Sequence, residues 1–139
     1  MSNTETWFDL ARNARKAANH LIREENFRSC IARAYYAAYS RVAHELVATA
    51  GLTMPRNREG PNHPGEFGTG GIRKMIESSM PDPLQASGQM AQTRREKLSE
   101  LIGRLYALRI AADYQPSMQV GQVDARAAIS ILNTIFDWL

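Results

Sequence analysis

The chain has 139 residues, 44% of them hydrophobic, which is enough apolar material for the core of a single domain over residues 1–139. Its formal net charge is only +3, although 14 of its 17 basic residues are arginine, which suits bidentate contacts with phosphate better than lysine does. No run approaches the roughly 18 apolar residues of a membrane-spanning helix, the N-terminus lacks an apolar signal region, and Cys30 has no partner for an internal disulfide. We therefore expect a cytoplasmic protein that makes no use of a membrane.

Apolar residues recur at helical spacing in the first third of the chain. This periodicity predicts a helix over about residues 6–22, with Ser2 or Thr4 as its N-cap. Ser2 and Glu5 also have the spacing of a capping box. A second helix is predicted over about residues 26–50, between an asparagine that can cap its start and a glycine that ends it.

Residues 51–71 are rich in glycine and proline and are predicted to form a long exposed loop within the domain. Helical periodicity returns in a short segment at about residues 72–80 and in a long helix over about residues 93–112. A final helix is predicted to begin after Asp124, and no stretch alternates convincingly as a strand. The sequence therefore predicts an all-α, up-and-down helical bundle of four long helices plus a short one.

Arg109 interrupts the apolar stripe of the helix predicted over residues 93–112. A guanidinium directed towards an apolar side needs a partner or a solvated groove, because an unpaired buried charge is costly. Asp113 is within reach, since side chains at i and i+4 meet on a helix. An acid that follows its arginine near a helix C-terminus opposes the helix dipole, so stability alone does not explain the pair. We therefore interpret Arg109 and Asp113 as candidate functional residues.

The second predicted helix contains three tyrosines that do not share one face. Its inward sector is predicted to hold Phe27, Ile31, Tyr35, Ala38, Tyr39, Val42 and Leu46. The other side gathers Arg33, Tyr36, Ala37, Ser40 and His44. That side is either ordinary surface or the lining of a groove or of a seam between two copies. Arg33, Tyr36 and His44 are the candidate binding residues on it.

Two segments carry a resemblance to a known family. They are ARAYYAAY at residues 32–39 and LYALRIAADY at residues 105–114. Together they resemble small stand-alone prokaryotic members of the HEPN superfamily, which show the pattern RAYYAAF followed downstream by R-x-x-A-D-Y. The resemblance extends over nearly the whole chain. It implies an all-α bundle that forms a homodimer and targets RNA in toxin–antitoxin or antiviral defence, often with a small nucleotidyltransferase or antitoxin as partner.

Active members of this superfamily resemble metal-independent ribonucleases that use an Arg-x4–6-His motif. In that motif the histidine handles the proton of the RNA 2′-hydroxyl, and the arginine stabilises charge on the phosphate. Arg109 lies where the motif arginine is expected, but no histidine follows it at the required spacing. The resemblance makes Arg109, Asp113 and Tyr114 the candidate catalytic residues of a degraded motif. The Arg109–Asp113 pair fits a structural or ligand-positioning role better than an acid–base role.

The loop predicted over residues 51–71 contains a second match to the spacing of that motif, because Arg56 and Arg58 both precede His63. Two prolines and a glycine in this stretch are incompatible with the helical geometry that the motif needs. We therefore expect Arg58 and His63 to contact phosphate rather than to catalyse. One cysteine and three scattered histidines give no metal-ligand spacing, and no phosphate-binding glycine motif is present, so neither metal nor cofactor is expected.

Three classes of function stay open at this level. The first is an HEPN-type protein that binds RNA or a nucleotide, with weak metal-independent ribonuclease activity as an extension. The second is a non-catalytic module that dimerises or holds a partner protein. The third is a toxin regulated by nucleotidylation of a tyrosine, for which Tyr114 is the candidate.

Overall fold

The computed structural model describes residues 6–51, 69–80 and 89–139. This part of the chain contains five helices and no strand. The helices are α1 (Trp7–Arg23), α2 (Phe27–Ala48), α4 (Thr69–Ser79), α5 (Gln89–Tyr114) and α6 (Gln122–Trp138). The prediction of an all-α bundle of four long helices plus a short one is confirmed.

Helix α1 begins with a complete capping box. The Oγ1 atom of Thr6 accepts a hydrogen bond from the Asp9 backbone N–H at 3.1 Å, and the Asp9 carboxylate accepts one from the Thr6 backbone N–H at 3.1 Å. The bond from the Thr6 backbone is the main reason why the pKa of Asp9 is lowered. The N-cap predicted at Ser2 or Thr4 is wrong, because the box lies directly before Trp7, the first residue that packs on the core.

A short turn reverses the chain between α1 and α2. The backbone N–H of Glu25 donates to the carbonyl of Ile22 at 3.2 Å, and that of Asn26 donates to the carbonyl of Leu21 at 2.9 Å. These two bonds around Glu25, whose φ is 59°, form a Schellman motif with a left-handed residue. Asn26 is the N-cap of α2, as predicted, but its side chain makes no capping hydrogen bond.

The later helix boundaries differ from the predicted ones by a few residues. Helix α4 begins at Thr69, inside the stretch 51–71 that was expected to be a loop, and residues 52–68 lie outside the described part of the chain. Helix α5 is longer than predicted at both ends. Helix α6 begins before Asp124 rather than after it, because the Asp124 carboxylate accepts a hydrogen bond from the Gly121 backbone N–H at 3.0 Å and stabilises the first turn from within.

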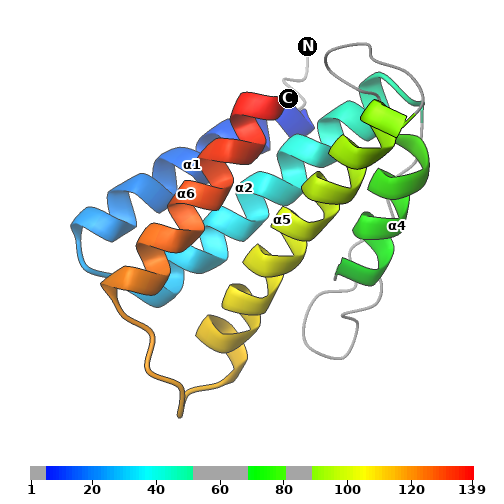
Figure 1. The fold of residues 1–139 in the computed structure, drawn as a ribbon. Coiled ribbons are helices and arrows are strands. Elements are labelled where there is room, and N and C mark those ends of the chain that lie inside the picture. Colours follow the sequence, from blue (N-terminus) through cyan, green and yellow to red (C-terminus); the bar gives the residue numbers. More distant parts are fainter. Residues whose placement is uncertain (1–5, 52–68, 81–88) are drawn as a thin grey trace, which may run out of the picture.

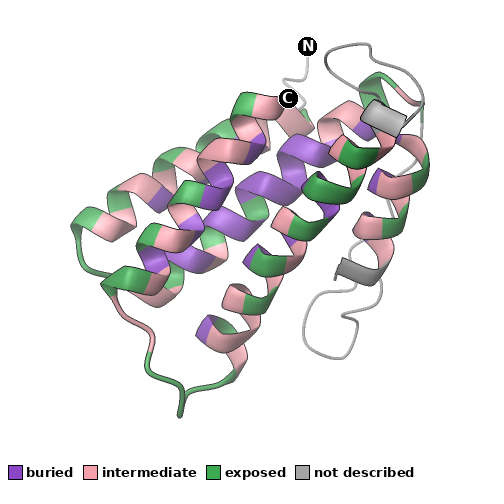
Figure 2. Cartoon of the chain, viewed as in Figure 1, coloured by how far each residue is buried: buried purple, intermediate pink, exposed green. Residues whose placement is uncertain are grey.

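Helix α2 lies at the centre of the bundle. It contacts α1, α4, α5 and α6, while α6 also contacts α1 and α5. Helix α4 lies beside α5 at one edge, and α1 lies at the opposite edge (Figure 1). Buried residues are concentrated along α2 (Figure 2), whereas the fully buried residues of α1 are all alanines. Small residues on α1 allow its backbone to approach α2 closely.

The burial of α2 extends to residues that were predicted to lie on its outer side. Ala37 and Ser40 are completely buried, whereas Arg33 and Tyr36 are exposed as expected. The prediction is wrong for Ala37 and Ser40 because four other helices pack around α2, so only a narrow stripe of it meets solvent. Of the residues predicted to face inward, all are buried except Phe27, which is half-buried.

Polar contacts connect the outer helices to the rest of the bundle. The Arg15 guanidinium of α1 donates to Asn133 Oδ1 at 2.8 Å and lies 4.5 Å from the centroid of the Phe136 ring, both on α6. Arg73 Nε of α4 donates to Ser99 Oγ of α5 at 2.8 Å. These contacts fix α1 and α4 at the two edges of the molecule.

Candidate functional site

A surface groove of about 360 Å³ lies between α2 and α5. Its lining residues are Ser29, Ala32, Arg33 and Tyr36 from α2 and Arg109 and Asp113 from α5. Four of these six belong to the eight candidates that the sequence indicated. The structure therefore brings together residues that are more than about 70 positions apart in the chain.

Helical spacing explains how each helix presents its groove residues. Ser29, Arg33 and Tyr36 follow one another at intervals of four and three residues, so they form one stripe along α2. Arg109 and Asp113 are one turn apart near the end of α5. The Tyr36 side chain is 38% exposed, which leaves part of its ring accessible from the groove.

Arg109 points neither into the core nor freely into solvent. Its guanidinium carbon lies 5.1 Å from the centroid of the buried Tyr35 ring, within cation–π range. Its Nε donates to Asp113 Oδ2 at 3.3 Å, and the two side chains are 27% and 28% exposed. A pair with this exposure contributes at most about 1 kcal/mol to stability. Its main consequence is that the guanidinium is held in one orientation at the groove.

The Tyr35 ring that faces Arg109 also contacts two other tyrosine rings. The ring centroids of Tyr35 and Tyr106 are 5.5 Å apart, and those of Tyr35 and Tyr39 are 6.3 Å apart. Burial raises the pKa of Tyr35 well above its usual range and that of Tyr39 to about 12. Burial also raises the pKa of Tyr106. All three hydroxyls are therefore neutral near pH 7, and the groove takes its charge from its arginines and its carboxylate.

Two of the described candidate residues, Tyr114 and His44, are not part of this groove. Tyr114 is half-buried at the end of α5 and does not line it. His44 lies further along α2, where its ring centroid is 5.2 Å from that of Phe8 on α1. Arg58 and His63 lie outside the described residues. Among the described residues, no histidine therefore reaches the groove.

Arg28 is a central residue that the sequence did not reveal. Its guanidinium donates to the carbonyls of Ala111 at 3.0 Å and Ala112 at 2.7 Å in the last turns of α5. It also donates to the carbonyls of Pro116, at 3.4 Å, and Met118 in the loop that follows. A cation at this position satisfies carbonyls that have no partner within the helix and interacts favourably with the helix dipole. Arg28 thereby fixes the helix end that presents the groove carboxylate.

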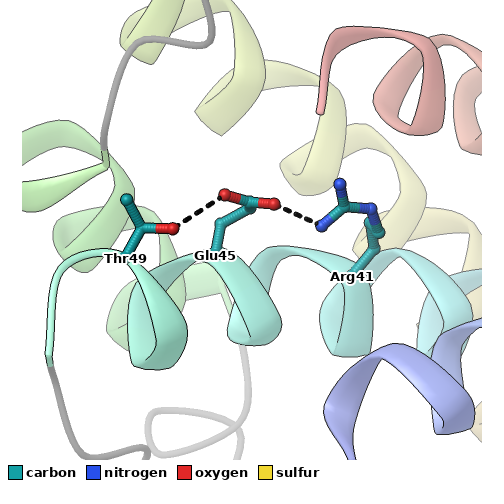
Figure 3. A network of polar contacts seen from close by, with 3 residues as sticks. All are labelled: Arg41, Glu45 and Thr49. Atoms are coloured by element: carbon teal, nitrogen blue, oxygen red, sulfur yellow. Dashed lines mark hydrogen bonds and ion pairs between the residues drawn. The ribbon is translucent and has the colours of Figure 1, made fainter.

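A second arginine, Arg41 on α2, is only 6% exposed and was also missed. Its Nη1 donates to Glu45 Oε1 at 2.7 Å, and Thr49 Oγ1 donates to the other carboxylate oxygen at 3.2 Å (Figure 3). The guanidinium carbon also lies 5.2 Å from the centroid of the Phe8 ring. The i,i+4 spacing of Arg41 and Glu45 was visible in the sequence and is the same as that of the pair in the groove. None of these residues lines the groove, and their contacts hold α1 against the second half of α2.

Within the described part of the chain, no three or more His, Cys, Asp or Glu side chains are grouped so that they could hold a metal ion. No helix in residues 6–51, 69–80 and 89–139 has the length and apolarity needed to cross a bilayer. The charged side chains that the groove offers to a ligand are those of Arg33, Arg109 and Asp113, with one net positive charge.

Comparison with family models, with curated proteins and with solved structures gives no match to this chain. The fold and the site together define an all-α bundle with an arginine- and tyrosine-lined groove between two of its helices.

Proposed function

We propose that the groove between α2 and α5 binds a phosphate and an adjacent base of single-stranded RNA, and that the chain is an HEPN-type protein of a toxin–antitoxin or phage-defence module. The observation that carries this proposal is the presence of two arginines and an accessible tyrosine ring in one groove. The family assignment is supported by the two HEPN-like segments, which lie on the neighbouring helices α2 and α5 of an all-α bundle.

Each of the three side chains has a distinct part in this binding. Arg33 has no ion pair or hydrogen bond with another described residue, so its guanidinium is available to a phosphate. Arg109 is already oriented by Asp113 and by the Tyr35 ring, which reduces the entropy lost on binding. The accessible ring of Tyr36 provides a surface on which a base can stack.

The geometry supports RNA binding better than RNA cleavage. Metal-independent cleavage requires a proton acceptor close to the 2′-hydroxyl, and the described groove residues include no histidine. Asp113 is the single carboxylate among them, and its Oδ2 is engaged by Arg109. Nucleotidylation of Tyr114 has no support from the groove, because this tyrosine does not line it.

The proposal is tested by fluorescence anisotropy with a labelled single-stranded 12-mer RNA and the purified chain. Arg33→Gln and Arg109→Gln are each expected to weaken binding about tenfold, which corresponds to about 1.4 kcal/mol for one charged hydrogen-bonded contact. Each substitution also lowers the slope of log K against log salt by about 0.7, because one phosphate contact is lost. Tyr36→Ala is expected to weaken binding at least fivefold through the loss of about 1–3 kcal/mol of stacking.

Arg12→Gln is the matched control, because Arg12 is an exposed arginine of α1 that lies outside the groove. If this control weakens binding as much as Arg33→Gln does, the attraction is general charge and the groove is not the site. Adenosine monophosphate as a competitor separates a single-nucleotide site from a longer RNA contact. Incubation of the RNA with the chain in the presence of a chelator measures cleavage separately from binding.

A further inference from the structure

A second groove, of about 390 Å³, lies on another side of the molecule between α5 and α6. Its floor is formed by Ile31 of α2, which is completely buried, and by Ile131 of α6, which is 6% exposed. Leu108 of α5 adds a third large apolar side chain. No residue is shared with the groove that contains Arg109, so this is a separate concavity.

Small residues leave this groove open. Ala107 and Ala111 on α5 face Ala127 on α6, and three methyl groups cannot fill the space between the two helices. Because the two isoleucines of the floor are buried, the apolar surface that water covers here is that of the alanines, of Leu108 and of Met118, and its transfer from water to contact with a ligand is favourable. The groove volume is within the range of small-molecule sites, which are mostly apolar concavities of about 300–1,000 Å³.

The connection between α5 and α6 closes one end of the groove with Met118 and Val120. The connection is fixed by Arg28, which donates hydrogen bonds to the carbonyls of Pro116 and Met118 and to the end of α5. The Met118 side chain nevertheless stays 50% exposed, and an apolar ligand in the groove would cover it.

The opposite end of the groove carries a cation without a partner. Arg104 lines the groove from α5 and makes no hydrogen bond or ion pair with another described residue. The groove also contains the negative charge of Asp124, four residues after Val120, and the Asp124 carboxylate accepts a hydrogen bond from the Gly121 backbone N–H. Arg104 and Ala111 are seven residues apart on one helix, so the cation lies about 10 Å along the groove from its closed end.

We propose that this second groove binds a small amphiphile with one anionic head group and an apolar tail, the head on Arg104 and the tail on Leu108, Met118 and Val120. Arg104 is exposed at its end of the groove, so an anionic head can pair with it, and the length of the groove specifies a tail of about 10 Å. The volume equals that of about 13 liquid waters at about 30 Å³ each, which admits roughly a dozen non-hydrogen atoms. A medium-chain carboxylate has these properties. A ligand of this size is expected to bind with a Kd on the order of 1 mM or tighter.

Decanoate, used below its micelle-forming concentration, is the probe. Titration of the isotope-labelled chain is followed by the methyl resonances of Leu108, Met118 and Val120 in two-dimensional NMR spectra. These resonances are expected to shift together with one saturating Kd. Ala127→Phe fills the groove from a half-buried position outside the core and is expected to weaken binding at least tenfold. Ala48→Phe adds the same ring at an exposed position of α2 and leaves binding unchanged.

The charge of the head group is tested with a second pair of variants and a second probe. Arg104→Glu is expected to weaken decanoate binding at least threefold, whereas Arg126→Glu, an equal charge change at an exposed position of α6 outside the groove lining, has a smaller effect. Decyltrimethylammonium, with the same tail and the opposite charge, binds more weakly than decanoate to the wild type.

Three results would overturn the proposal. They are decanoate shifts scattered over the surface without saturation, equal binding to the Ala127→Phe variant, and equal binding of the two probes. Circular dichroism of each variant checks that the bundle is intact, so a loss of binding is attributed to the groove and not to unfolding. None of these outcomes depends on the RNA experiment, since the two grooves share no residue.

Discussion

Two arginine–acid pairs of this chain have the same four-residue spacing, and we predict that they contribute differently to the free energy of unfolding. The side chains of Arg41 and Glu45 are 8% and 22% exposed, and their charged atoms are 2.7 Å apart. The side chains of Arg109 and Asp113 are 27% and 28% exposed, at 3.3 Å. Charge interactions strengthen as the surroundings become less polar, and removal of one partner from a buried pair leaves the other charge uncompensated.

Glu45→Ala is expected to lower the free energy of unfolding by about 3 kcal/mol, because the Arg41 guanidinium then stays buried without an anionic partner. Asp113→Ala is expected to change it by no more than about 0.5 kcal/mol, because Arg109 remains in contact with water. Alanine at both positions keeps the difference in helix propensity to a few tenths of a kcal/mol. Urea denaturation followed by circular dichroism measures both values under the same conditions.

A double variant tests the physical cause. Arg41→Met removes the charge but keeps a long apolar side chain against Phe8. If the uncompensated cation is the reason for the loss, Arg41→Met with Glu45→Ala is more stable than Glu45→Ala alone by at least about 1 kcal/mol. The reasoning is refuted if Glu45→Ala and Asp113→Ala cost the same, or if the double variant is less stable than Glu45→Ala.

Two further predictions concern the hydrogen bonds that Arg28 donates at the end of α5 and the burial of Tyr39. Arg28→Met is expected to lower the free energy of unfolding by about 2 kcal/mol, because carbonyls in residues 115–121 lose a charged donor. Amide hydrogen exchange in these residues is expected to become faster. Exchange at the wild-type rate in NMR spectra would contradict this. In the unfolded chain the Tyr39 hydroxyl loses its proton near pH 10, whereas in the folded chain it keeps this proton up to about pH 12. The free energy of unfolding is therefore highest below about pH 10 and falls by about 1.4 kcal/mol per pH unit between about pH 10 and 12. Tyr39→Phe is expected to remove that part of the slope in urea denaturation across this range, and an unchanged slope would count against the assigned burial effect.

The helices could be predicted because each of them has an apolar stripe that recurs at helical spacing. This signal comes from short stretches of sequence, and it placed α1 and α5 close to their observed positions. It failed on the outer side of α2, where Ala37 and Ser40 are buried although their neighbours Arg33 and Tyr36 are exposed. Periodicity describes a helix with one buried side, whereas α2 is surrounded by its neighbours.

Four of the six residues that line the groove could be predicted for a similar reason. Arg109 and Asp113 are local to one helix, so their contact follows from spacing alone. The contact between Arg28 and the end of α5 joins residues more than about 80 positions apart, and no local pattern indicates it. The same limit applies to Arg41, because only the packing of Phe8 from α1 distinguishes it from an exposed arginine with an acid one turn later.

The central position of α2 has a consequence for how the chain folds during synthesis. The segment from Phe27 to Ala48 leaves the ribosome before α5 and α6 exist, and α6 ends about 90 residues later. At about 5–20 residues per second, this interval lasts on the order of 4–18 s. Until α4 and α5 are complete, α1 is the one described helix that can cover Tyr35 and Val42, both buried in the finished bundle. The nascent α1–α2 hairpin therefore exposes apolar surface that the later helices cover, and transient exposure of this kind favours aggregation.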